Sequence, residues 1–197
     1  MDSINPSFDS NPMNICKKLE IDPYFDLDRV LGDWIIVHSW NVSLQNKCVE
    51  VKIRYATEQI TKRFMNDMYD HLESQPLWDA ATLYLTMGVA EHEMLLFADQ
   101  GTAGSFVAIP NILKEASILP MRTYAVPLLK FHVKLLHGAQ YLLIADCKYG
   151  VSSLMARKED GVDRLHVLRM IKNLDIGEGM VTCDVNIDEL KRQGYIL

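Results

Sequence analysis

The stretch Phe25-Asp26-Leu27-Asp28-Arg29-Val30-Leu31-Gly32-Asp33-Trp34 marks the point where periodic structure begins in this chain. Residues 1–24, which precede it, are rich in Asn, Ser, Asp and Pro and show no period, so we expect an irregular leader there. Gly32 lets the backbone turn tightly where a side chain would collide, and Trp34 opens the first strand-like segment. We therefore expect one folded domain over residues 25–197.

Strand-like alternation is clearest in residues 48–55, where Val49, Val51, Ile53 and Tyr55 share one face and charged residues share the other. Similar apolar faces occur within 83–89 (Leu83, Leu85, Met87) and within 130–135 (Phe131, Val133, Leu135). Further strand-like segments are 34–40, 61–70, 94–99, 104–109, 140–147 and 151–158, although the polar mixture of 61–72 would also suit a short helix.

The pattern changes after the last strand-like segment. Leu165, Leu168 and Ile171 recur at helical spacing, with Asp163 near the start and Lys172 near the end, as the helix dipole prefers. Many strands and one amphipathic helix indicate an antiparallel sandwich or barrel. Periodicity does not choose between these two architectures.

Composition excludes several classes of partner. The chain has 197 residues and a formal net charge of −6, which argues against nucleic acid and against anionic membrane surfaces. No apolar run approaches the roughly 20 residues that span a bilayer. The N-terminus lacks the basic start and apolar core of a signal peptide, which taken literally indicates the cytosol.

The four cysteines, Cys16, Cys48, Cys147 and Cys183, form no CxxC pair, so zinc or a thioredoxin-type site is not expected. Disulfides and free core cysteines both remain open, and a nucleophilic Cys147 has no local enzyme signature. We expect no metal site, because the histidines lack close pairing (His38, His71, His92, His132, His137 and His166). Asn41-Val42-Ser43 is a glycosylation sequon at Asn41.

The Gly-x-Trp at residues 32–34, with a short leader before it and strands after it, resembles the opening signature of the lipocalins. Segments 141–147 and 154–157 resemble that family's seventh and eighth strands, although the Thr-Asp-Tyr motif before the seventh is matched only at Tyr141. The resemblance implies an all-β, up-and-down antiparallel eight-stranded barrel over 25–197, with one C-terminal α-helix packed outside and a tail. It also implies that Trp34 plugs the closed end under Arg157, a cation–π contact worth about 0.5–2 kcal/mol.

The cysteine positions resemble those of insect bilin-binding lipocalins of the insecticyanin type. That resemblance implies the pairs Cys16–Cys147 and Cys48–Cys183, one of three possible connectivities. Such disulfides require an oxidising compartment. We therefore expect an extracellular, secreted protein in its mature form, despite the missing signal peptide.

The resemblance implies binding and transport of a small hydrophobic ligand in the barrel, with no catalytic residues and no required cofactor. A lipid, a bilin or another pigment, such as a biliverdin-like tetrapyrrole, is the implied ligand. The alternatives are an interaction or signalling protein whose barrel is filled with side chains, an enzyme on this scaffold, and a cytosolic fatty-acid-type barrel. The alternation predicts which side chains line the ligand-binding cavity, and His38 and Tyr55 are the candidates for hydrogen bonds that orient the ligand. The predicted lining residues are Ile36, His38, Val49, Val51, Ile53, Tyr55, Leu83, Leu85, Met87, Phe131, Val133, Leu135, Tyr141 and Leu143.

Overall fold

The computed structural model describes residues 16, 17, 19, 25–42, 44, 48–89, 91–99, 101–112 and 125–183. The leader expected for residues 1–24 lies largely outside the described residues. The strands are β1 (Gly32–Trp40), β2 (Glu50–Tyr55), β3 (Ala81–Met87), β4 (His92–Ala98), β5 (Ser105–Pro110), β6 (Leu129–Leu136), β7 (Tyr141–Asp146), β8 (Ser152–Arg157) and β9 (Met180–Val181). The α-helices are α2 (Glu58–Met68) and α4 (Arg164–Leu174), and short 3-10 helices cover Leu27–Val30, Tyr69–His71, Trp78–Ala80 and His137–Ala139.

Strands β1 to β8 form a closed barrel. Each strand from β2 to β7 pairs with the next, and β1 pairs with both β8 and β2. Trp34 marks the closure, since it lies opposite Arg157 of β8 on one side and opposite Val51 of β2 on the other. All of these pairings are antiparallel, so the predicted eight-stranded up-and-down barrel is confirmed.

The far half of β1 has a different neighbour. Strand β2 pairs with β1 only from Gly32 to Ile35, and β9 pairs with His38 and Ser39 beyond that point. The hydroxyl of Thr182 also donates to the carbonyl of Ile36 at 2.7 Å. The chain after α4 therefore satisfies backbone groups that β2 leaves without a sheet partner.

Helix α2 replaces the strand expected at residues 61–70, and that strand prediction is wrong. The hydroxyl of Thr57 caps the helix by accepting a hydrogen bond from the amide of Ile60. Phe64 and Met68 are fully buried in a cluster with outward-facing residues of β4 and β5, including Leu95. Since the helix covers the barrel from outside, its polar surface faces solvent, which explains the mixed pattern in the sequence.

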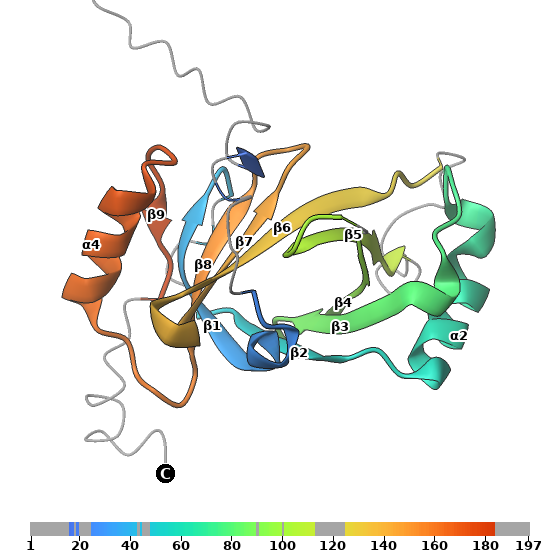
Figure 1. Cartoon of the computed structure of the whole chain (residues 1–197), viewed down its shortest axis with the longest axis horizontal. Helices are drawn as coiled ribbons and strands as arrows, with labels where there is room; N and C mark the ends of the chain where they lie inside the picture. Colours follow the sequence, from blue (N-terminus) through green and yellow to red (C-terminus); the bar gives the residue numbers. More distant parts are fainter. Residues whose placement is uncertain are drawn as a thin grey trace, which may run out of the picture.

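Helix α4 covers another part of the barrel and confirms the predicted C-terminal helix. The Asp163 carboxylate accepts hydrogen bonds from the amides of Leu165 and His166, which fixes the helix start. Val167 and Met170 pack on the outer face of β1, β7 and β8. Helices α4 and α2 thus flank the barrel from opposite sides (Figure 1).

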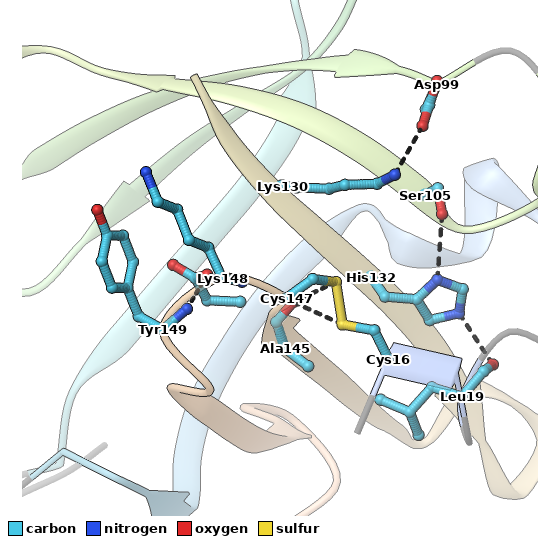
Figure 2. Close-up of a disulfide and its surroundings, with 11 residues drawn as sticks. Cys16, Leu19, Asp99, Ser105, Lys130, His132, Ala145, Cys147, Lys148 and Tyr149 are labelled. Atoms are coloured by element: carbon cyan, nitrogen blue, oxygen red, sulfur yellow. Dashed lines mark hydrogen bonds and ion pairs between the residues drawn. A yellow bond between two sulfur atoms is a disulfide. The ribbon is translucent and has the colours of Figure 1, made fainter. Parts of the chain in front are cut away.

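Two disulfides tie distant segments to the barrel, and both predicted pairs are confirmed. Cys16 bonds to Cys147 just after β7, and Cys48, before β2, bonds to Cys183, after β9. Near the first bridge, His132 donates from Nε2 to the carbonyl of Leu19 and accepts at Nδ1 from the Ser105 hydroxyl (Figure 2). These contacts hold the segment around Cys16 against the outer face of β5 to β7.

Within the described part of the chain, no helix combines the length and the apolar character needed to cross a membrane.

Candidate ligand-binding site

The inner wall of the barrel is a single apolar cluster. It includes Trp34 and Met155 together with inward-facing side chains from β1 to β8. Ten of the predicted lining residues belong to this cluster: Ile36, Val49, Val51, Ile53, Leu83, Leu85, Met87, Phe131, Val133 and Leu135.

Burial along this wall falls from the middle of the barrel toward the open end. The end that contains Trp34 is the closed end, and the end where β1 finishes and β2 begins is the open end. Wall residues deep in the barrel, such as Ile53, Leu83 and Val133, are at most 1% exposed. Six wall residues toward the open end are only partly buried, and we call them the rim residues: Val49, Met87, Met94, Leu129, Phe131 and Ile144.

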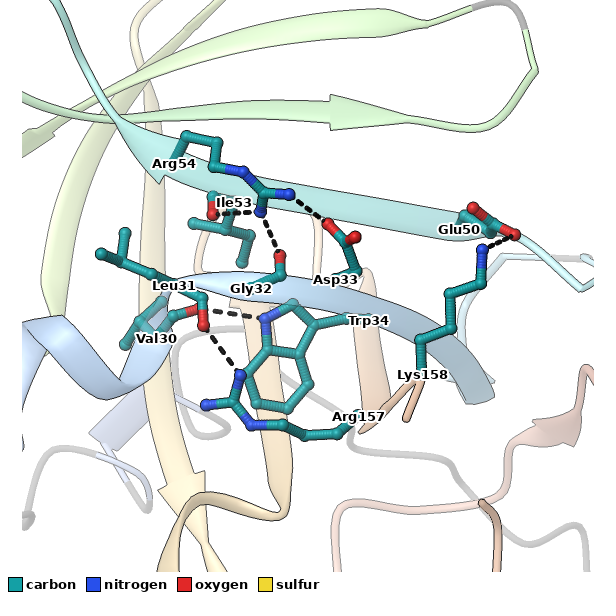
Figure 3. A network of polar contacts seen from close by, with 10 residues as sticks. All are labelled: Val30, Leu31, Gly32, Asp33, Trp34, Glu50, Ile53, Arg54, Arg157 and Lys158. Atoms are coloured by element: carbon teal, nitrogen blue, oxygen red, sulfur yellow. Dashed lines mark hydrogen bonds and ion pairs between the residues drawn. The ribbon is translucent and has the colours of Figure 1, made fainter. Parts of the chain in front are cut away.

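The closed end is built around Trp34, which is fully buried (Figure 3). Its indole Nε1 donates to the carbonyl of Val30 at 2.9 Å, and the guanidinium carbon of Arg157 lies 4.1 Å from its ring centroid. Arg157 also donates to the carbonyl of Leu31 at 2.8 Å. The predicted contact of Arg157 over the indole of Trp34 is therefore confirmed.

Strand β7 faces opposite to the prediction. Tyr141 and Leu143 belong to the outer cluster beneath α4, where the Tyr141 ring stacks on His166. Burial, followed by the charge of Asp163, raises the pKa of Tyr141. The inward residues are Leu142 and Ile144. The two predicted lining positions on this strand are therefore wrong by one residue, which reverses the face.

His38 also lies outside the inner wall, because the β1–β8 register shifts between Ile36 and His38. The His38 ring contacts the Trp40 ring at a centroid distance of 4.5 Å, and both side chains pack against Gly179. Burial lowers the pKa of His38, and neither ring nitrogen has a hydrogen-bond partner among the described residues. The prediction that His38 lines the cup is wrong.

Tyr55 is the fourth predicted residue outside the wall cluster. Its side chain is 44% exposed at the closed end, and its hydroxyl donates to the carboxylate of Asp28 beside the short helix Leu27–Val30. That hydrogen bond raises the pKa of Tyr55. Tyr55 lies opposite the inner-facing Leu83 at the end of β2, but its hydroxyl is engaged by Asp28 at the closed end, so the prediction that it orients a ligand is wrong.

Several inner-wall residues were not predicted. Ser39 and Ser153 lie opposite each other, and Ser153 lies opposite Ile144, so both hydroxyls share the inner face near the open end. The apolar residues missed on β4, β5, β7 and β8 carry little alternation signal, because their neighbours on the outer face are also buried or partly buried: Met94, Leu96, Phe106, Ala108, Leu142, Ile144 and Met155. Leu129 continues the alternation of β6 and lies one residue before the segment predicted as 130–135.

Asn41, in the predicted sequon, is exposed and has a positive φ of 58°. Its side-chain Nδ2 donates to the carbonyl of Gly150 at 2.9 Å, and glycosylation there stays a prediction. Among the described residues, no group of three or more His, Cys, Asp or Glu side chains could hold a metal ion.

Comparisons with known proteins identify no sequence relative: no protein-family model and no curated protein matches the chain. Solved structures similar to it include crystal structures of LTBP1 and of an LTBP1 point mutant, each in complex with leukotriene C4. Each aligns with a TM-score of 0.45 at 13% identity over 84% of this chain, and the alignments cover 91% and 92% of the respective LTBP1 chains. The closed eight-stranded barrel, with strands in sequential order and a helix packed outside, has a lipocalin-like fold.

Proposed function

We propose that this protein binds one small apolar molecule inside the barrel. The observation that carries the proposal is the inner wall itself, whose apolar side chains continue to the open end and stay partly exposed there. Converging apolar side chains at an exposed opening are typical of ligand sites. A barrel of eight strands has an interior of the size that holds one small ligand.

Binding would then be driven by burial of ligand surface, worth about 25 cal/mol per Å² of apolar area removed from water. The hydroxyl groups of Ser39 and Ser153 are among the polar groups on this wall near the open end. That of Ser39 already donates to the carbonyl of Val42 at 3.1 Å. The proposal includes no catalytic step and no required cofactor.

The proposal extends to a secreted carrier. Two disulfides support it, because such bonds persist in oxidising compartments. The resemblance to insect bilin-binding lipocalins adds a biliverdin-like tetrapyrrole as a possible ligand. The visible absorption spectrum of the protein purified from its source tests that ligand, because a bound tetrapyrrole is coloured.

The test uses Nile red, a neutral dye that fluoresces in apolar surroundings. We expect saturable uptake by the native protein and at least about a tenfold loss of affinity in Met87→Arg, since the new charge would enter the apolar rim. The matched control is Thr86→Arg, which adds the same charge to the outer face of the same strand and is expected to bind normally.

Two outcomes would contradict the proposal. Absence of dye uptake by the native protein would favour the alternative of an interaction protein with a filled barrel. Equal affinities of both folded arginine variants and the native protein would place the dye outside the barrel.

A further inference from the structure

Among the described residues, the carboxylate that lies on the inner face beside the rim residues is that of Asp146. Asp146 is the last residue of β7 and lies opposite Phe131 in the β6–β7 register. Opposite residues in an antiparallel pair project to the same face, and Phe131 packs against the inner-wall cluster. The flanking residues Ala145 and Cys147 belong to the outer cluster, as alternation requires.

Of the two oxygens of this carboxylate, Oδ1 is the one that accepts hydrogen bonds from described residues. Oδ1 accepts hydrogen bonds from the amides of Lys148 at 2.7 Å and Tyr149 at 2.9 Å, which fixes the turn between β7 and β8. Oδ2 accepts no hydrogen bond from any described residue, and it is not among the fully enclosed polar atoms that lack a partner. Although the residue is only 6% exposed, Oδ2 keeps its full acceptor capacity.

No cation neutralises Asp146 within the part of the chain that the structure describes. The lysines nearest in sequence to Asp146 and Phe131 have other contacts: Lys148, two residues after Asp146, lies over the Tyr149 ring, and Lys130 faces Asp99 at 3.7 Å. Besides Asp146, the open half of the described strands has one more ionisable residue that the register places on the inner face. It is His92, which lies opposite Met87.

We propose that Asp146 makes the barrel selective for apolar ligands with a positively charged, hydrogen-bond-donating head, such as an alkylammonium, over ligands with a carboxylate head. The inference rests on the proposed function. The apolar body of the ligand lies along the inner wall, and its N–H group donates to Oδ2 at the rim. A hydrogen bond between two charged groups is about twice as strong as a neutral one, whereas a carboxylate head would face a like charge. Biliverdin, with two carboxylates, belongs to the disfavoured class.

The experiment displaces Nile red with three ligands that share a twelve-carbon chain: dodecylamine, 1-dodecanol and dodecanoate. It is run below their micelle-forming concentrations at about pH 8, where the amine is charged. For the native protein we expect dodecylamine to bind at least about tenfold more tightly than dodecanoate, with dodecanol between them.

The decisive variant is Asp146→Asn. Its Oδ1 can still accept from the two turn amides, while an NH₂ donor replaces the free acceptor and the negative charge is lost. We expect the preference for the amine to disappear while dodecanol affinity changes less than about twofold. The matched control, Glu91→Gln, removes one charge from the exposed turn between β3 and β4 at the same end, and it should retain the preference.

Three outcomes would overturn the inference, and a fourth would refute the proposed function. Equal binding of the amine and the carboxylate by the native protein, or a preference that survives Asp146→Asn, would show that Asp146 does not select the ligand. An equal loss of preference in Glu91→Gln would assign the effect to net charge. Failure of Nile red and all three ligands to bind would instead refute the proposed function itself.

Discussion

At the scale of single residues, the closed end shows why a glycine precedes the buried tryptophan by two positions. Gly32 has a φ of +136°, a conformation that residues with a side chain rarely adopt. A Cβ atom at this position would lie 2.4 Å from Nη1 of Arg157. Glycine is therefore required for the Arg157 guanidinium to reach over the indole of Trp34 and cap it.

His38 gives a residue-scale prediction about pH. It is 4% exposed and burial lowers its pKa, so the folded state takes up a proton less readily than the unfolded state. The contribution of His38 to the free energy of unfolding is therefore fully present above the ordinary histidine pKa of about 6.5, and it is lost as pH falls below that value toward the folded pKa.

Urea unfolding of the native protein and His38→Gln, between about pH 7.5 and 5, measures this effect. Carboxyl groups titrate in both proteins, so the difference between the two curves isolates His38. We expect the native protein to lose more stability than the variant over this range. Parallel curves would contradict the assigned burial of a neutral imidazole.

At the scale of elements, α2 is attached to the barrel by apolar and by charged contacts. Glu93 of β4 is 5% exposed and accepts a hydrogen bond from the Tyr84 hydroxyl at 2.6 Å. The Arg63 guanidinium of α2 pairs with the same carboxylate at 3.1 Å. Burial, followed by the hydrogen bond to Glu93, raises the pKa of Tyr84. This pairing fixes the position of α2 over β3 and β4, beside the buried side chain of Phe64.

Truncation of Phe64 tests how much of the stability comes from this attachment. Phe64 is fully buried between α2 and the outer face of the barrel, so Phe64→Ala is expected to lower the free energy of unfolding by about 3–5 kcal/mol. Met65→Ala, at a neighbouring position that is 38% exposed, is the control and should cost less than about 1 kcal/mol. Similar losses in the two variants would show that α2 is not docked as described.

At the scale of the whole molecule, the disulfides connect the two ends of the chain to the barrel. Cys16–Cys147 joins residues 131 positions apart, and Cys48–Cys183 joins residues 135 positions apart. Each bridge closes a loop that contains most of the strands. In the chain-entropy view, such long loops strongly restrict the unfolded state.

Removal of the second bridge in Cys48→Ser/Cys183→Ser is expected to lower the free energy of unfolding by about 2–5 kcal/mol. Urea unfolding measures the loss, and the double variant Cys16→Ser/Cys147→Ser provides the matched comparison. Peptide mapping under non-reducing conditions should recover both pairs. Four alkylatable thiols in the native protein would contradict both the connectivity and the secreted assignment.

The sequence by itself determined which side chains face inward in the elements that expose one face to solvent. The inward sets of β2, β3 and β6 follow from alternation, because their outer faces carry polar or charged residues such as Lys52 and Lys130. Helix α4 was predictable for the same reason, since one side of it packs on the barrel and the other faces water. Resemblance in the sequence, rather than periodicity, supplied the barrel and the cysteine pairs.

Only the tertiary structure decided the remaining features. Strand β7 is covered inside by the barrel wall and outside by α4, so its apolar run carries no signal of direction. The register shift after Ile36 turns His38 outward, and it depends on pairing with β8, a strand more than a hundred residues away. The inner-face position of Asp146 likewise depends on pairing with β6. Alternation indicates which face a residue occupies only where one face of the strand is exposed to solvent and the register stays regular.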